Sequence, residues 1–178
     1  QTPVIKQNAY PYNWITCSQA QKLASQMESG RNTTSLMFGV QWDLVLKYLE
    51  TKGATQAELN LDSASWGNSK NSLWNITNTN SKYAVNGENW TSGAYGRKTE
   101  SKAVVLSTGA SDTFSKQGIY DLAGNVWEWT LEYANDSGSP CALRGGGCNQ
   151  SGEDFPIVRS EHDKDYNIWD LGFRITLY

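Results

Sequence analysis

The sequence predicts an α+β protein with two helices, short antiparallel sheets and much irregular loop. Two segments in the first third repeat apolar residues with the period of an amphipathic helix, and later segments alternate apolar and polar residues as half-buried strands do. Only 38% of the 178 residues are hydrophobic and 19% are charged. Asn, Ser, Thr and Gly fill the difference, and this composition favours a loop-rich chain over a helical bundle.

The first helix is predicted to run from a cap at Thr16 through Met27. Thr16 and Gln19 have the spacing of a capping box, in which each side chain accepts the other residue's backbone N–H. The second helix is predicted over residues 40–52, because Gly53 is suited to the position just past a helix end. Its buried face is expected to hold Val40, Leu44, Tyr48 and Leu49.

The strongest strand signal is Val126–Thr130, which would place Trp127 and Trp129 on one face and Glu128 on the other. Each aromatic side chain can bury roughly 150–250 Å², so the two indoles should anchor the core. An unpaired charge between core residues is costly. Glu128 therefore needs a partner, either a metal ion or backbone N–H groups. Further strands are predicted at 102–107, 142–144 and 171–178.

Three motifs stand in order along the chain: GIYDLAGNVWEWT at 118–130, Leu143-Arg144-Gly145-Gly146, and Gly172-Phe173-Arg174. Together they resemble the formylglycine-generating-enzyme (sulfatase-modifying factor) family. The resemblance implies a C-type-lectin-like fold of the formylglycine-generating-enzyme type. At 178 residues the chain is most simply one domain at 1–178, with 147–171 as the candidate variable ligand-binding region. Function has to be argued separately, because different sites are grafted onto one fold.

Charge and hydropathy exclude two classes of partner. The net charge is −3 and the sequence pI is about 5.2. The chain therefore lacks the excess of Lys and Arg that neutralises phosphates in nucleic-acid-binding proteins. No apolar run is long enough to cross a bilayer, so membrane insertion is not expected. The chain begins with Gln1, which we interpret as a processed or trimmed form. The compartment is left open, with an extracellular surface or a virion tail favoured.

Catalytic members of the family carry two cysteines shortly after the Arg-Gly-Gly motif and bind copper with them, since soft thiolates suit that metal. Here only Cys148 follows Arg144, and it stands too early to be either member of the pair. His162 is the only histidine, too few for the histidine-rich iron site of a related branch. We therefore expect no enzymatic activity and no required cofactor. A metal-dependent oxidase of the formylglycine-generating type is the alternative.

The three cysteines are an odd number, which argues against a full disulfide framework. Cys141 and Cys148 either close a short loop through a disulfide or remain as two free, partly buried thiols. Cys17 is expected to be structural.

The resemblance also implies a structural calcium site, because some family members bind an ion with the segment that matches 121–128. Hard oxygen ligands suit calcium. In the alternative, Asp121 caps a turn and Glu128 accepts backbone N–H groups. A calcium-dependent glycan binder is a further alternative, although the sugar-binding motifs of true C-type lectins are missing. The implied ligands are the side chains of Asp121 and Glu128 and the carbonyls of Gly124 and Val126.

Residues 147–171 carry six acidic and two basic side chains, so this segment has a net charge of −4 against −3 for the whole chain. Aromatic residues beside like charges suit a binding surface better than a core. The alternative is a solvated acidic loop with its aromatics tucked under it. The residues expected on the binding face are Cys148, Gln150, Ser151, Glu153, Asp154, Phe155, Ile157, Glu161, His162, Asp163, Asp165, Tyr166, Ile168 and Trp169.

The C-terminal layout also resembles the variable proteins of diversity-generating retroelements, in which adenine-directed mutagenesis scrambles chosen codons on a lectin-like scaffold. This resemblance implies a non-enzymatic receptor-binding protein of a phage or bacterial surface. Its partner would be a protein or glycan receptor on another cell or virion. The concentrated negative charge predicts a basic or amphipathic partner surface and salt-weakened association. The fixed frame would be Arg144, Gly145, Gly146, Gly172, Phe173 and Arg174.

Overall fold

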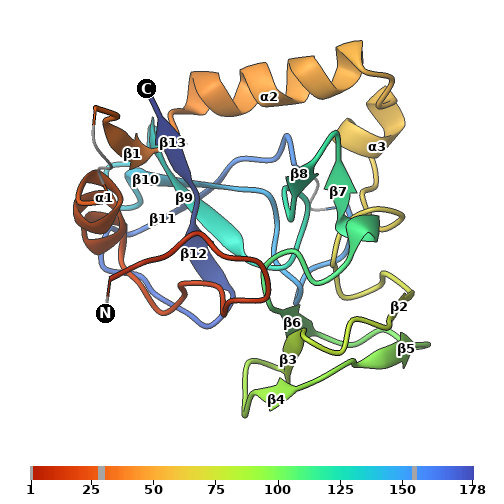
Figure 1. Cartoon of the computed structure of the whole chain (residues 1–178). Helices are drawn as coiled ribbons and strands as arrows, with labels where there is room; N and C mark the ends of the chain where they lie inside the picture. The colour runs from red at the N-terminus through yellow and green to blue at the C-terminus, as the bar shows by residue number, and fades with distance from the viewer. Residues whose placement is uncertain (1, 28–30, 154–155) are drawn as a thin grey trace.

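The three α-helices lie in the first third of the chain, most of the strands follow them, and together they form a mixed α+β fold (Figure 1). The computed structural model describes residues 2–27, 31–153 and 156–178. Its helices are α1 (Cys17–Ser25), α2 (Gly39–Thr51), α3 (Gln56–Asn60) and the 3-10 turn η1 (Asp112–Phe114). Its strands are β1 (Thr34–Leu36), β2 (Trp74–Ile76), β3 (Lys82–Val85), β4 (Thr91–Ser92), β5 (Gly96–Lys98), β6 (Val104–Leu106), β7 (Ser115–Lys116), β8 (Ile119–Tyr120), β9 (Trp127–Tyr133), β10 (Cys141–Arg144), β11 (Ser160–His162), β12 (Leu171–Phe173) and β13 (Ile175–Leu177).

The largest sheet has the strand order β11-β10-β9-β12. Strands β9, β10 and β11 pair antiparallel, but β12 runs parallel to β9, with Leu171 opposite Trp127. The prediction of only antiparallel sheets is therefore wrong at this edge. A parallel pair needs a long crossover connection, and residues 134–170 supply it.

The predicted C-terminal strand is divided at Arg174 between two sheets. Residues before it form β12 on the large sheet, and residues after it form β13, which pairs with β1 so that Thr34 lies opposite Leu177. Alternation alone could not reveal this break, because the apolar pattern continues through it.

The first predicted helix is confirmed as α1, which ends at Ser25. Gln19 donates its backbone N–H to Thr16 Oγ1 at 3.3 Å, and Thr16 donates its own to Gln19 Oε1 at 3.2 Å, which completes the capping box. The third helix, α3, was not predicted. The sequence carries the same helix-start pattern there as at α1, since Thr55 and Glu58 make a second capping box.

The second helix has nearly the predicted bounds, but the predicted buried face is wrong for three of its four residues. Val40, Leu44 and Tyr48 are 67%, 63% and 43% exposed, and the side that faces the core carries Trp42, Leu46 and Leu49. The indole of Trp42 is fully buried and donates Nε1–H to Pro156 O at 2.8 Å. Because it is the largest apolar group on the helix, its burial decides which side faces inward.

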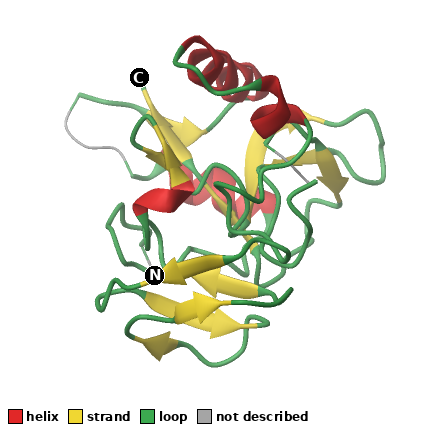
Figure 2. Cartoon of the chain, turned by 90° about the vertical axis from the view of Figure 1, so that its right-hand side faces the viewer, coloured by secondary structure: helices red, strands yellow, loops and turns green. Residues whose placement is uncertain are grey.

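The sequence predicts a largely irregular region at 54–117, in which 102–107 is the clearest strand, but residues 61–126 hold more strands than this. They contain the small sheets β2-β5, β4-β3-β6 and β7-β8, and the strands β2 to β6 form the lower part of the molecule (Figures 1 and 2). Two buried amides help to join these sheets to the segment just before β9: Asn125 accepts the Leu106 N–H at 2.8 Å, and Asn68 donates to Asn125 Oδ1 at 3.0 Å.

Strand β9 is buried on both faces over its first four residues, Trp127 to Thr130. Trp127 and Trp129 pack in a core cluster with α1, Leu143 and Leu171, as expected from the indole pair. The opposite face, which carries Glu128 and Thr130, is buried as well. The prediction of a strand is confirmed, and Glu128 lies deeper than a half-exposed strand would place it.

Candidate ligand-binding site

Glu128 has a partner that the sequence analysis missed, the guanidinium of Arg174. Nε and Nη2 of Arg174 donate to the two carboxylate oxygens of Glu128, each at 2.9 Å, and Nη2 also donates to Tyr120 O at 3.0 Å. Burial raises the pKa of Glu128, and the charge of Arg174 opposes that shift. This bidentate ion pair links β9 to the break between β12 and β13, and it explains why an arginine follows Gly172-Phe173.

Asp121 lies at a turn with a positive φ of 54° and accepts the Gly109 N–H at 2.7 Å. Burial raises its pKa to about 6, against the lowering effect of this bond. The residues proposed for calcium do not fit the ion as they are arranged, because Arg174 occupies both oxygens of Glu128. Within the described ranges, no three His, Cys, Asp or Glu side chains gather as a metal site.

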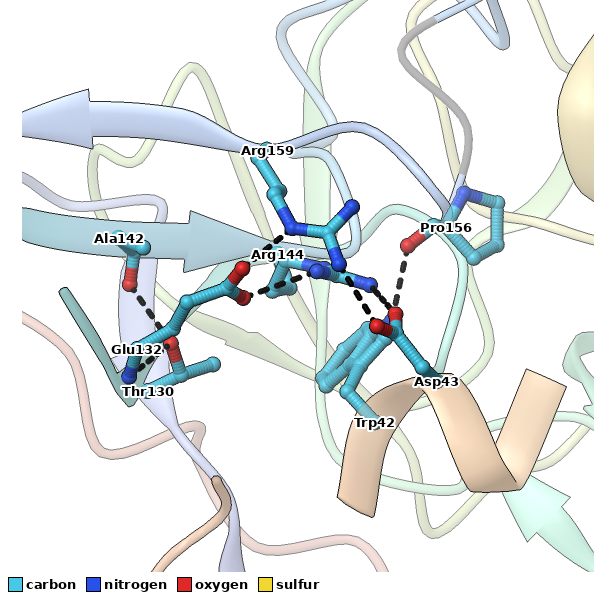
Figure 3. A network of polar contacts seen from close by, with 8 residues as sticks. All are labelled: Trp42, Asp43, Thr130, Glu132, Ala142, Arg144, Pro156 and Arg159. Atoms are coloured by element: carbon cyan, nitrogen blue, oxygen red, sulfur yellow. Dashed lines mark hydrogen bonds and ion pairs between the residues drawn. The ribbon is translucent and has the colours of Figure 1, made fainter. Parts of the chain in front are cut away.

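Four charged side chains, Arg144 among them, form a closed ring of ion pairs (Figure 3). Arg144 is fully buried and donates to Glu132 Oε2 at 2.9 Å and to Asp43 Oδ1 at 2.6 Å. Arg159 donates to the other oxygen of each carboxylate, to Asp43 Oδ2 at 2.7 Å and to Glu132 Oε1. The Arg144 guanidinium also lies over the Trp42 ring, 5.6 Å from its centroid.

This ring fastens the acidic segment 147–171 to the scaffold. Asp43 comes from α2, Glu132 from β9 and Arg144 from β10, while Arg159 belongs to the segment itself. The bond from Trp42 to Pro156 adds a second attachment (Figure 3). The segment therefore presents its side chains from a fixed base.

The structure separates the acidic and the aromatic residues of the segment. The exposed positions of the predicted face are mainly acidic, whereas the aromatic residues are half-buried and pack against the core. Their position agrees better with the alternative of tucked aromatics than with a fully exposed aromatic surface. Asp154 and Phe155 lie outside the described residues. The exposed positions are Glu153, Ile157, Glu161, Asp163 and Asp165, and the half-buried ones are Gln150, Ser151, His162, Tyr166, Ile168 and Trp169.

Cys148 does not belong to an exposed face, because its side chain is fully buried between Val105 and Val126 in a core cluster. Burial raises the pKa of its thiol well above the usual value. All three cysteines are free thiols, so the alternative of a bond between Cys141 and Cys148 is not realised here. Cys141 instead neighbours Cys17, and burial followed by this contact raises the pKa of Cys17 to about 12.

Trp169 is held by a close approach to the β3 region. A Cβ at Gly87 would lie 2.3 Å from the Trp169 ring, and the positive φ of 70° at Gly87 also favours glycine there. Trp169 packs with Trp90 against the cluster that contains Cys148. Its role in the structure is therefore partly that of an anchor.

A cavity of about 80 Å³ lies between the large sheet and the acidic segment. His162 and Tyr166 stack at its wall, with their ring centroids 3.8 Å apart and an angle of 4° between the ring planes. Trp127 donates Nε1–H to Gln150 Oε1 at 2.9 Å at the same site. Four of the predicted face residues therefore meet here, together with residues that the sequence analysis did not select. The lining residues are Trp127, Leu143, Asn149, Gln150, Ser160, His162, Tyr166, Ile168, Asp170 and Leu171.

Comparison with known proteins supports this description of the scaffold. The family described as sulfatase-modifying factor enzyme 1-like domain matches residues 3–177. The crystal structure of CarF is similar with a TM-score of 0.54 at 15% sequence identity, over 92% of this chain and 65% of that one. At this identity the likeness concerns the fold alone.

None of the curated proteins searched matches the sequence. Among the helices in the described part of the chain, none has the length and apolar character of a membrane span.

Proposed function

The chain belongs to the sulfatase-modifying factor enzyme 1-like family, and on this premise we propose that it is a non-enzymatic ligand-binding protein. Its binding face is the acidic segment 147–171. The observation that carries this proposal is the attachment of that segment. A ring of ion pairs that includes the fully buried Arg144 holds its base, while Glu161, Asp163 and Asp165 remain exposed. Exposed, chemically varied side chains on a rigid scaffold are typical of recognition surfaces.

The state of Cys148 supports binding over thiol-dependent oxidation. A thiolate is the form that binds a metal or attacks a substrate, and burial keeps the Cys148 thiol protonated. The oxidase alternative would need this sulfur to be ionised and accessible. The ion pair between Arg174 and Glu128 likewise leaves the calcium-dependent glycan binder without a prepared ligand set.

The finer proposal is that the scaffold is C-type-lectin-like and that the face is diversified, as in the variable proteins of diversity-generating retroelements. Binding would then be to a protein or glycan receptor on another cell or virion. The exposed carboxylates favour a basic or amphipathic receptor surface, and the rate of association should fall as ionic strength rises.

A binding screen with matched variants tests the proposal. The immobilised protein is exposed to a glycan array and to purified surface proteins, and saturable binding is then measured between 50 and 300 mM salt. The double variant Glu161→Gln/Asp163→Asn should weaken binding and flatten its salt dependence. The control Glu100→Gln, an exposed position away from the segment, should leave both unchanged.

Two results would contradict the proposal. One is binding that is equally sensitive to the Glu100 and the Glu161/Asp163 changes. The other is oxygen consumption with a thiol peptide after loading with copper, abolished by Cys148→Ser. The diversification part has a separate genetic test. A near-copy of the 3′ coding end, differing at adenines and lying beside a reverse-transcriptase gene, would support it, and the absence of such a copy would remove it.

A further inference from the structure

The cavity behind the acidic segment contains two hydrogen-bond acceptors that lack partners. Asp170 lines the cavity and is only 1% exposed. Its Oδ2 and the Oδ1 of Asn149, another lining residue, accept no hydrogen bond from any described residue. Buried polar atoms are nearly always paired in proteins, so two exceptions among the residues that line one cavity indicate a place prepared for a donor.

The donor should carry a positive charge. Burial raises the pKa of Asp170 to about 6, while a bond from its own backbone N–H lowers it. At neutral pH the carboxyl is therefore mostly ionised, and a buried carboxylate without a cation is strongly unfavourable. The two basic residues of the segment are paired elsewhere, Arg159 with Asp43 and Glu132, and Lys164 with Asp165.

The walls of the cavity are compatible with a small cation. Burial lowers the pKa of His162, so its imidazole is neutral at pH 7 and does not repel a positive group. Gly147 packs closely against this wall, because a Cβ there would lie 2.5 Å from Asp170 Oδ2 and 2.8 Å from Gln150 Oε1. The exposed carboxylates of Glu161 and Asp163 lie on the same segment and attract cations toward it.

The size of the cavity limits the ligand. Its volume of about 80 Å³ corresponds to roughly two or three water molecules at about 30 Å³ each. The ammonium group and the first one or two methylenes of an alkylamine or a lysine side chain fit this space, whereas a sugar ring or a quaternary ammonium is too large. An ammonium also has three N–H donors, enough to reach two acceptors.

We propose that this cavity binds a primary ammonium group, with Asp170 Oδ2 and Asn149 Oδ1 accepting its N–H bonds. The inference rests on the proposed binding function and assigns it a ligand class. The ammonium can belong to a free alkylamine or to a lysine side chain of the receptor, and the two sources share this chemistry.

Nuclear magnetic resonance titration of the full chain tests the proposal. The reporter is the indole N–H of Trp127, which lines the cavity and donates to Gln150. The probes are n-butylammonium for the free amine and Nα-acetyl-lysine amide for the side chain. The neutral 1-butanol and the larger tetramethylammonium serve as controls. A ligand of this size is expected to bind with a dissociation constant of roughly 1 mM or tighter.

The expected result is a saturable shift with at least one of the primary amines and none with the two controls. Asp170→Asn, which keeps the shape of the side chain, should weaken binding by about tenfold or more. Glu100→Gln, at an exposed position away from the segment, should change it by less than about threefold. The probe that binds identifies the source, because a lysine pocket should accept the acetylated amino acid as well as the simple amine.

Three results would overturn the inference: no saturable shift with either amine, an equal response to 1-butanol, or unchanged affinity in Asp170→Asn. The fold of the variant is checked independently by its unfolding curve, so loss of binding cannot be mistaken for misfolding. The broader function is tested separately. If the amines fail while receptor binding still depends on Glu161 and Asp163, the ligand class is wrong and the binding function stands.

Discussion

Replacing Arg144 by Met should destabilise the protein far more than removing Arg159, although both arginines contact the same two carboxylates. Arg144 is fully buried, and its bonds of 2.9 and 2.6 Å hold Glu132 and Asp43 from the inside of the ring. The Arg159 side chain is 46% exposed and contacts the same groups from the solvent side. Comparing the two variants therefore measures the effect of burial alone, because both arginines make the same kind of ion pair with the same carboxylates (Figure 3).

The magnitudes follow from solvent screening. Removing one member of a buried ion pair costs about 3–5 kcal/mol, since it leaves uncompensated charge in a poorly solvated place. Exposed pairs are worth roughly 0.2–1 kcal/mol each, so Arg159→Gln should cost about 1 kcal/mol. For a chain of this size, Arg144→Met should lower the melting temperature by about 6 to 20 °C, and Arg159→Gln by about 4 °C or less.

Urea unfolding at pH 7, followed by tryptophan fluorescence, gives both free energies on one scale. Arg144→Lys is the control for charge, because it keeps the cation but cannot bridge two carboxylates as a planar guanidinium does. It should fall between wild type and Arg144→Met. Equal costs for the Arg144→Met and Arg159→Gln variants, or a cost below about 1 kcal/mol for Arg144→Met, would refute this reasoning.

Three further predictions concern other buried or capping groups. Glu128→Gln should lower the free energy of unfolding by about 3 kcal/mol, because it leaves the positive charge of Arg174 without its carboxylate partner. A urea unfolding curve that matches wild type would contradict this. Asp170 has a folded-state pKa raised from 3.8 to about 6, so the folded state retains a proton that the unfolded chain has released. Stability should therefore fall by about 3 kcal/mol between pH 3 and 7 through this group. Thermal melts of Asp170→Asn should lack that part of the decline, and parallel curves for the two proteins would rule it out. Thr16→Ala should cost about 1 kcal/mol by removing the cap of α1, measured by chemical unfolding, with Thr16→Ser as a near-neutral control.

The cavity was only partly predictable from the sequence. The sequence predicts Gln150, His162, Tyr166 and Ile168 as site residues because aromatic and polar residues are mixed with acids in one segment, and all four line the cavity. It shows Asp170 only as one acidic residue among six, and it does not distinguish Asn149 as a site residue. Their importance lies in oxygens that lack partners, and a sequence does not show which hydrogen bonds are made.

The sequence by itself determined the helix start at Thr16, the strand at Trp127–Trp129, the family scaffold and the acidic bias of the C-terminal segment. These depend on neighbours in the chain, on period and on motif order. Tertiary structure decided that Trp42 turns α2 inward, that Arg174 pairs with Glu128, and that Cys148 is buried. Each depends on packing or charge pairing between residues distant in sequence, so local pattern alone could not specify it.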